Sequence, residues 1–132
     1  MAEKIRFDLV APERLLRSTD VDMVVVPGVD GDFGVLPGHA PVVSTVRPGV
    51  VEVHDAADVD RVFVAGGVCE VSQDRCTVLA DDAVPVADLD RGEVEQRLKD
   101  AREDLADAET DAQSHKAAAA VALLTELLQA AP

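Results

Sequence analysis

The sequence predicts an α+β protein: an N-terminal antiparallel β-sandwich, or flattened barrel, followed by a C-terminal antiparallel α-helical hairpin. A change of composition indicates the two parts. Of 23 valines, 21 lie at or before Val86, whereas 12 alanines lie from Ala87 onward. Valine favours the pleated, half-buried surface of a strand, and alanine favours helix. We therefore expect a β-sandwich domain over residues 1–86 and a helical hairpin over residues 87–132.

The first half repeats short apolar runs that end in turn residues. These runs read VDMVVVPG, GVVEVHD, RVFVAGG, CEVSQD and CTVLAD. Runs of this length, closed by Pro-Gly, Gly-Gly or Asp-rich breaks about every 10 residues, are typical of a sandwich or barrel. The pair Gly66-Gly67 predicts a strand bend or a close backbone approach.

The second half has the 3.6-residue period of amphipathic helices. One apolar stripe consists of Val94, Leu98, Ala101, Leu105 and Ala108, and a second of Val121, Leu124, Leu127 and Leu128. We expect Asp90 to cap the first helix, with Glu93 three residues later, and Ser114 to cap the second. Favourable i,i+4 pairs are expected at Glu93–Arg97 and Glu95–Lys99.

The segment Val26–Pro41, VPGVDGDFGVLPGHAP, is predicted to be a specifically shaped loop between strands. Its glycines permit backbone angles that other residues avoid, and its prolines fix theirs. Its scaffold residues are Gly28, Gly34, Pro37, Gly38, His39 and Pro41. His39 lacks a second ligand or an acid at useful spacing, so we expect it to hydrogen-bond within the loop or lie at a subunit contact. Phe33 and Leu36 are expected to be buried.

Charge and hydropathy restrict the function. With 12 basic and 26 acidic residues, the net charge of −14 argues against nucleic acid and against anionic membrane surfaces. The longest apolar run, Ala117–Leu124, falls short of the ~20 residues of a membrane span. The N-terminus has no apolar signal-peptide core, so we expect a cytoplasmic protein without direct membrane insertion.

No side chains assemble an evident catalytic or metal site. The sequence holds no nucleophile–base set and no phosphate-binding GxxxxGK[ST] motif, so we expect no catalytic residues, no cofactor and no metal. Cys69 and Cys76 are predicted to be core residues of a hairpin that turns at Ser72–Arg75. In that register Val71 faces Cys76 and Cys69 faces Val78, which sets the thiols on one diagonal.

In order and spacing, the motifs of this chain resemble those of the epsilon subunit of F-type ATP synthases. The matching segments are FDLVAPERLL, VDMVVVPG, PGHAP, RPGVVEV, VAGGVCEV and TVLADDAV. The resemblance implies a rotor part of the central stalk that links the gamma subunit to the c-subunit ring and couples proton translocation to ATP synthesis. It also implies a peripheral location at the cytoplasmic face of a bacterial inner membrane and hairpin contacts with the alpha and beta subunits.

The resemblance assigns the ring contact to the glycine-rich segment. Asp32 occupies the acidic position of the family's GxxG[ED]xG stretch, which lies beside the basic polar loops of the c ring. We expect Asp32 to bind there, helped by Asp30 and flanked by Gly31 and Phe33. The alternative is that both aspartates are ordinary turn residues, since Asp-Gly is common in turns.

Two departures from the family concern the hairpin. Its ATP motif is degenerate: Leu89 and Asp90 match, but Glu93 replaces an arginine and Val94 an alanine, so we expect no useful ATP binding. From Asp88 onward there are 5 basic and 11 acidic residues, whereas inhibitory hairpins present basic residues to acidic catalytic subunits. We expect this hairpin to stay folded on the sandwich and to inhibit ATP hydrolysis weakly.

Two other functions remain open at this point. A stand-alone β-sandwich would bind metal through Glu52, His54 and Asp55, although His54 and Asp55 point to opposite faces of a strand. A free-standing hairpin adaptor would act without gamma.

Overall fold

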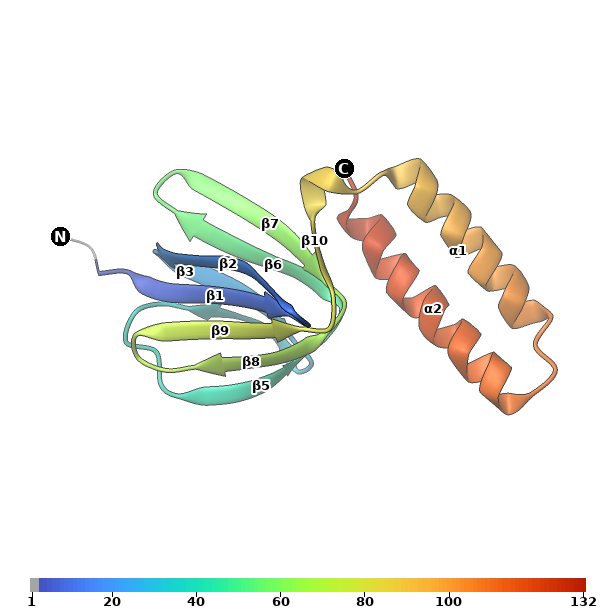
Figure 1. Cartoon of the computed structure of the whole chain (residues 1–132), viewed down its shortest axis with the longest axis horizontal. Helices are drawn as coiled ribbons and strands as arrows, with labels where there is room; N and C mark the ends of the chain where they lie inside the picture. The colour runs from blue at the N-terminus through green and yellow to red at the C-terminus, as the bar shows by residue number, and fades with distance from the viewer. Residues whose placement is uncertain (1–2) are drawn as a thin grey trace. The chain divides into compact units, whose positions relative to one another are not determined.

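The computed structural model describes residues 3–132, and the chain divides into two compact units, the first ending at Pro85 and the second spanning Val86–Pro132. Ten strands make up the first unit (Figure 1). They are β1 (Ile5–Ala11), β2 (Arg14–Val21), β3 (Met23–Gly28), β4 (Gly31–Val35), β5 (Val42–Val46), β6 (Gly49–Asp55), β7 (Asp58–Val64), β8 (Gly67–Val71), β9 (Arg75–Ala80) and β10 (Ala83–Pro85).

These strands form one curled sheet. Its order is β10-β7-β6-β3-β5-β8-β9-β1-β2, and β4 pairs with β3. Among the described residues every strand pair is antiparallel except β1 with β9, which run parallel. The predicted fold class, a β-sandwich domain followed by a helical hairpin, is confirmed, with this one parallel pair added.

Alternation along the strands builds an aliphatic core. Fully buried side chains at every second position include Ile5, Phe7 and Leu9 of β1 and Val51 and Val53 of β6. Because the two faces of a strand alternate, the residues between them point outward. The sheet can therefore fix which side chains a partner would meet.

Gly67 lies at a close approach of two backbones in the sheet. A Cβ at this position would lie 2.0 Å from the carbonyl oxygen of Leu79, and the residue has a φ of +146°. Only glycine fits both conditions. The close approach predicted for the Gly-Gly pair is confirmed.

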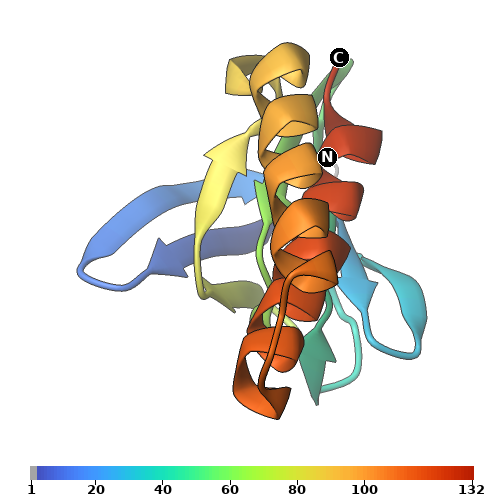
Figure 2. The ribbon, with the colours of Figure 1, turned by 90° about the vertical axis from the view of Figure 1, so that its right-hand side faces the viewer.

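The second unit begins with a 3₁₀ turn (Val86–Asp88) and continues with α1 (Arg91–Ala106) and α2 (Asp111–Ala130), which lie antiparallel side by side (Figure 2). Val94, Leu98 and Ala101 of the first predicted stripe are buried, as are Leu124 and Leu127 of the second. Asp90 caps α1 as predicted, and its carboxylate accepts from the Glu93 N–H at 3.1 Å.

The predicted start of the second helix is wrong. Thr110, not Ser114, is the cap, and its hydroxyl accepts from the Gln113 N–H at 3.1 Å. The polar residues at this point interrupt the apolar stripe but include no glycine or proline, so the helix already forms there. Within residues 3–132 the ion pair on α1 is Arg91–Glu95 at 3.4 Å, not the expected Glu93–Arg97 and Glu95–Lys99.

Candidate subunit interface

The glycine-rich segment is more regular than the sequence predicts. Half of it is a β-hairpin, in which β3 and β4 pair from Val24↔Val35 to Gly28↔Gly31. Val29 and Asp30 form the turn, and Gly31 has a φ of +130°, which favours glycine. Asp32 therefore lies in a strand rather than in a loop, because the alternating small and apolar residues extend the ladder to the turn.

Asp32 is exposed at this end of the hairpin and is held by an arginine. The Arg47 guanidinium forms an ion pair with its carboxylate, and the side chains are 40% and 60% exposed, respectively. Asp30, in the adjacent turn, is also exposed. The sequence prediction named Asp30 and Asp32 as contact residues and did not include Arg47, although RPG follows β5 directly.

The PGHAP element is fixed by hydrogen bonds. The Gly38 N–H donates to the Gln73 carbonyl at 2.7 Å, and Gly38 has a φ of +84°. His39 Nδ1–H donates to the Ala40 carbonyl at 2.7 Å, consistent with the predicted scaffold role.

Phe33 is partly buried against the core, but Leu36 is 54% exposed, so its predicted burial is wrong.

An apolar row crosses the outer face of four neighbouring strands. The ladders align Val68 of β8 with Leu79 of β9, Leu79 with Val10 of β1, and Val10 with Leu15 of β2. Val68, Leu79 and Leu15 are 37%, 42% and 65% exposed, whereas the adjacent Val78 and Leu9 are buried. We call Val68, Leu79, Val10 and Leu15 the apolar row. Apolar side chains in line on an outer face are typical of interaction surfaces.

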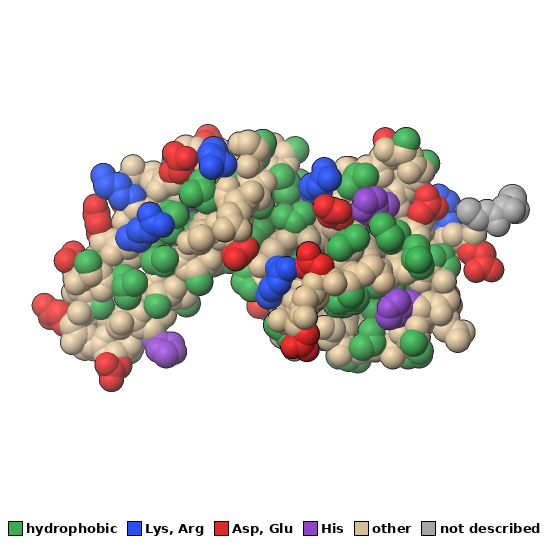
Figure 3. Space-filling view, turned by 180° about the vertical axis from the view of Figure 1, so that it is seen from behind, with side chains coloured by type: hydrophobic (Ala, Val, Ile, Leu, Met, Phe, Trp, Pro, Cys, Tyr) green, Lys and Arg blue, Asp and Glu red, His purple; other side chains and the backbone are tan. Residues whose placement is uncertain are grey.

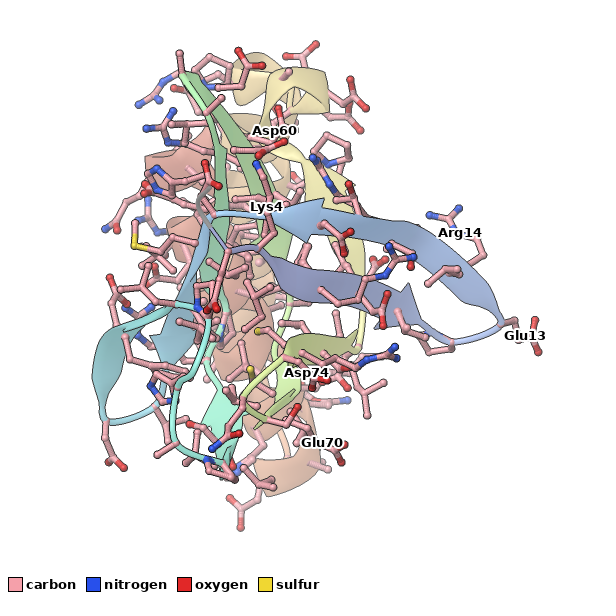
Figure 4. The ribbon with its side chains drawn as sticks, turned by 90° about the vertical axis from the view of Figure 1, so that its left-hand side faces the viewer. Lys4, Glu13, Arg14, Asp60, Glu70 and Asp74 are labelled. Carbon is pink, nitrogen blue, oxygen red and sulfur yellow. The ribbon has the colours of Figure 1, made fainter. Side chains whose placement is uncertain are left out.

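Beside the apolar row lies a charged network on the same face. Asp8, the one buried charged residue in the described part of the chain, accepts from the Ser18 hydroxyl at 2.5 Å and from Arg75 Nη1 at 3.0 Å. Arg6 also approaches it, at 3.8 Å. The network joins β1, β2 and β9, so it fixes the strands that carry the row. The β1–β2 hairpin projects beyond the sheet, with Glu13 and Arg14 at its tip (Figure 4).

A second charged cluster joins Lys4 to Asp22 and Asp55. Hydrogen bonds with Asp55 and Asp22 raise the pKa of Lys4 above its ordinary value. The Ala56 N–H, which donates to Asp22 at 2.7 Å, and Lys4, at 3.0 Å, lower the pKa of the Asp22 carboxyl. The three side chains are 37–44% exposed, so their ion pairs contribute little to stability.

The two cysteines lie in the core as predicted. The ladder pairs Cys69 with Val78 and Val71 with Cys76, and the two Sγ atoms are 3.8 Å apart. The contact with Cys69 and burial raise the pKa of the Cys76 thiol. A buried thiol with a raised pKa stays protonated, which makes Cys76 a poor nucleophile.

The residues considered as a metal site, Glu52, His54 and Asp55, take part in two separate contacts. His54 Nε2 contacts Glu52 Oε1 at 3.2 Å, while Asp55 pairs with Lys4. Residues 3–132 contain no group of three or more His, Cys, Asp or Glu side chains arranged for a metal.

The degenerate ATP motif serves as the start of α1. Asp90 is the cap, and Val94 is buried. Arg91 Nη1 donates to the carbonyls of Leu128 and Ala131 at 3.3 and 3.4 Å, so this guanidinium binds the end of α2. Arg91, the basic side chain in this segment, is thus already hydrogen-bonded within the protein. Figure 3 shows acidic side chains scattered over the helical unit, with several basic ones among them.

Comparison with known proteins identifies the family. Residues 4–86 match the family described as ATP synthase, Delta/Epsilon chain, beta-sandwich domain. The ATP synthase epsilon chain of Rhodospirillum rubrum is 53% identical over 131 residues, covering 98% of each chain. The chain belongs to the ATP synthase epsilon chain family. The epsilon chain of Paramagnetospirillum magneticum is 56% identical over 112 residues, covering 84% of each chain.

Solved structures share the fold of this epsilon chain. A chain of the Euglena gracilis mitochondrial ATP synthase, in a structure of OSCP/F1/c-ring, matches with a TM-score of 0.87 at 22% identity, covering 96% of this chain and 81% of that one. A chain of the Tetrahymena thermophila mitochondrial ATP synthase, in a central stalk/c-ring structure, gives 0.66 at 17% identity, with 96% and 97% covered. Neither helix in the described part of this epsilon chain has the length and apolar character of a membrane span.

Proposed function

We propose that this epsilon chain is a non-catalytic rotor subunit, which links the gamma subunit to the c ring and so couples proton translocation to ATP synthesis. The observation that carries this proposal is the apolar row, because it offers a partner an outward apolar surface on a rigid sheet. In this proposal gamma covers the row, and the chain is held peripherally at the cytoplasmic face of a bacterial inner membrane through its partners.

A charge in the apolar row tests the gamma contact. Leu79→Asp should weaken binding to purified gamma by more than about tenfold, because it removes a Leu contact and would bury an unpaired carboxylate. Val59→Asp is the matched control, since Val59 is 38% exposed but lies on β7, away from the row. Equal affinity of the Leu79→Asp variant and the unmodified chain, both folded by circular dichroism, would refute the gamma site.

The ring contact is proposed at the β3–β4 turn. Asp32 accepts a hydrogen bond or ion pair from the polar loops of the c subunits, with Asp30 adding negative charge and Gly31 and Phe33 shaping the turn. Support comes from the exposure of both carboxylates at the tip of a regular hairpin. Asp32→Lys should weaken attachment of the rotor to the ring, measured as ATP-driven proton pumping in membranes.

The hairpin is proposed to bind no ATP at physiological levels and to inhibit ATP hydrolysis weakly, with contacts to the alpha and beta subunits at most transient. Glu93 would face phosphate with a like charge, and Arg91 already donates to the end of α2. Isothermal titration of the purified chain tests the first part. A dissociation constant at or below cellular ATP concentrations would contradict it.

A further inference from the structure

Three backbone contacts hold Arg47 and the two residues before it against the β3–β4 hairpin. The Arg47 N–H donates to the Pro27 carbonyl at 2.9 Å. The preceding residue, Val46, pairs with Gly28 at the end of β3. The Val29 N–H, in the turn, donates to the Thr45 carbonyl at 3.0 Å. The backbone of Arg47 is therefore fixed beside the proposed ring contact.

The side chain of Arg47 crosses a gap that Gly49 leaves open. A Cβ on Gly49 would lie 2.8 Å from Arg47 Nη1 and 3.0 Å from Pro27 Cβ. The absent side chain thus gives the guanidinium room to lie over Gly49 and reach Asp32 through Nη2. The RPG motif has a physical reason in this chain: the arginine supplies the donor and the glycine supplies the space.

Stability does not explain this arrangement. Ion pairs between half-exposed side chains contribute about 0–1 kcal/mol. What the pair does is restrict the rotation of the Asp32 carboxylate, because Arg47 contacts Oδ1. A carboxylate has about four acceptor sites, so Oδ2 stays available to a second donor.

We propose that Arg47 is the positioning residue of the ring contact: it holds Asp32 in one orientation, so that a partner segment carrying a basic side chain meets a preformed carboxylate. This inference rests on the proposed function, since it takes Asp32 as the contact. Preorganisation raises affinity by removing the ordering cost at binding. The Asp32 carboxylate and the Arg47 guanidinium then act together in the contact.

Variants of Arg47 in the intact ATP synthase test this. Arg47→Ala should weaken retention of F1 and proton pumping per ATP hydrolysed by about three- to tenfold, the range for loss of one ordered side chain. Arg47→Lys keeps the charge without the planar fork and should be intermediate. Lys4→Ala is the matched control, because Lys4 is 41% exposed, also pairs with aspartate, and contacts Asp55 at the far end of β6. It should retain full coupling.

A double variant separates positioning from a structural role. In an Asp32→Asn background, Arg47→Ala should add little, and the thermal midpoint of the isolated chain should shift no more than with Lys4→Ala. Full additivity, or stronger attachment after Arg47→Ala, would overturn the positioning role. Loss of attachment with Asp32→Lys but not with Arg47→Ala would overturn this inference alone. Full attachment with both Asp32→Lys and Asp32→Asn would overturn the ring contact of the proposed function.

Discussion

At the scale of single residues, two turn positions carry backbone strain. Glu13 and Ala56 have φ angles of 65° and 54°, a region that costs a residue with a Cβ about 1–2 kcal/mol. Ala56 is kept there because its N–H donates to Asp22. The turn therefore gives up some stability to complete the Lys4–Asp22–Asp55 cluster.

Ala56→Gly should raise the free energy of unfolding by about 0.5–1 kcal/mol, because relief of the left-handed backbone exceeds the added entropy of the unfolded chain. Urea unfolding at pH 7 measures it. Ala57→Gly is the control: its φ is not positive, so it should be slightly destabilising. A loss of stability in Ala56→Gly would show that the strain argument fails.

Asp22 should make stability depend on pH in the acid range. Its pKa is lowered in the folded chain from 3.8, so its contribution is fully present above that value and is lost as pH falls through the lower folded pKa. The gap in unfolding free energy between the unmodified chain and Asp22→Asn should therefore narrow below pH 3.8. Urea titrations from neutral to acid pH measure the gap, with exposed Asp58→Asn as control. A gap independent of pH would contradict the assignment.

At the scale of elements, Arg91 links the two ends of the helical hairpin. Arg91 donates from the start of α1 to carbonyls at the end of α2, where the helix dipole favours a cation. The contact ties the two helix ends that lie farthest from the connecting turn. The same contact engages Arg91, the basic side chain in the segment compared with the ATP motif, with the end of α2.

Arg91→Met should lower the opening free energy of the last turn of α2 by about 0.5–1.5 kcal/mol, the usual value of such hydrogen bonds. Hydrogen exchange of the Ala131 amide, which donates to the Leu127 carbonyl, measures it. Arg97→Met on the exposed side of α1 should leave the exchange unchanged. Equal effects of the two variants would assign the change to lost charge rather than to the contact.

At the scale of the whole molecule, charge governs the proposed regulation. The net charge is −14, and the region from Asp88 onward holds 5 basic against 11 acidic residues. Approach to another acidic surface is repulsive within a Debye length of about 8 Å. In the proposed function, the negative charge of the helical hairpin is the reason that its inhibition is weak.

Deleting residues from Gly92 onward should release little latent ATPase in the intact enzyme. Replacing the exposed Glu103 and Asp104 with lysine should instead increase inhibition, because the added cations favour the acidic catalytic subunits. ATPase assays of membranes carrying each variant make the comparison. A several-fold rise in activity after the deletion would contradict weak inhibition.

Local signals determined much of this protein. The turn residues, the apolar periods and the Asp90 cap could be predicted because each depends on residues near in sequence. The close approach at Gly67 could be predicted from the Gly-Gly pair itself. The start of α2 could not be placed, since Thr110 and Ser114 are both good caps and an interrupted apolar stripe does not end a helix.

Tertiary structure alone decided the surfaces. The apolar row exists because three ladders, including the parallel β1–β9 pair, set Val68, Leu79, Val10 and Leu15 in line. Arg47 reaches Asp32, 15 residues away, only because β3 carries both β4 and the end of β5. The sequence alone therefore determined most of the elements and suggested Asp30 and Asp32 as candidates, while strand register decided their neighbours, since register joins residues that no local pattern connects.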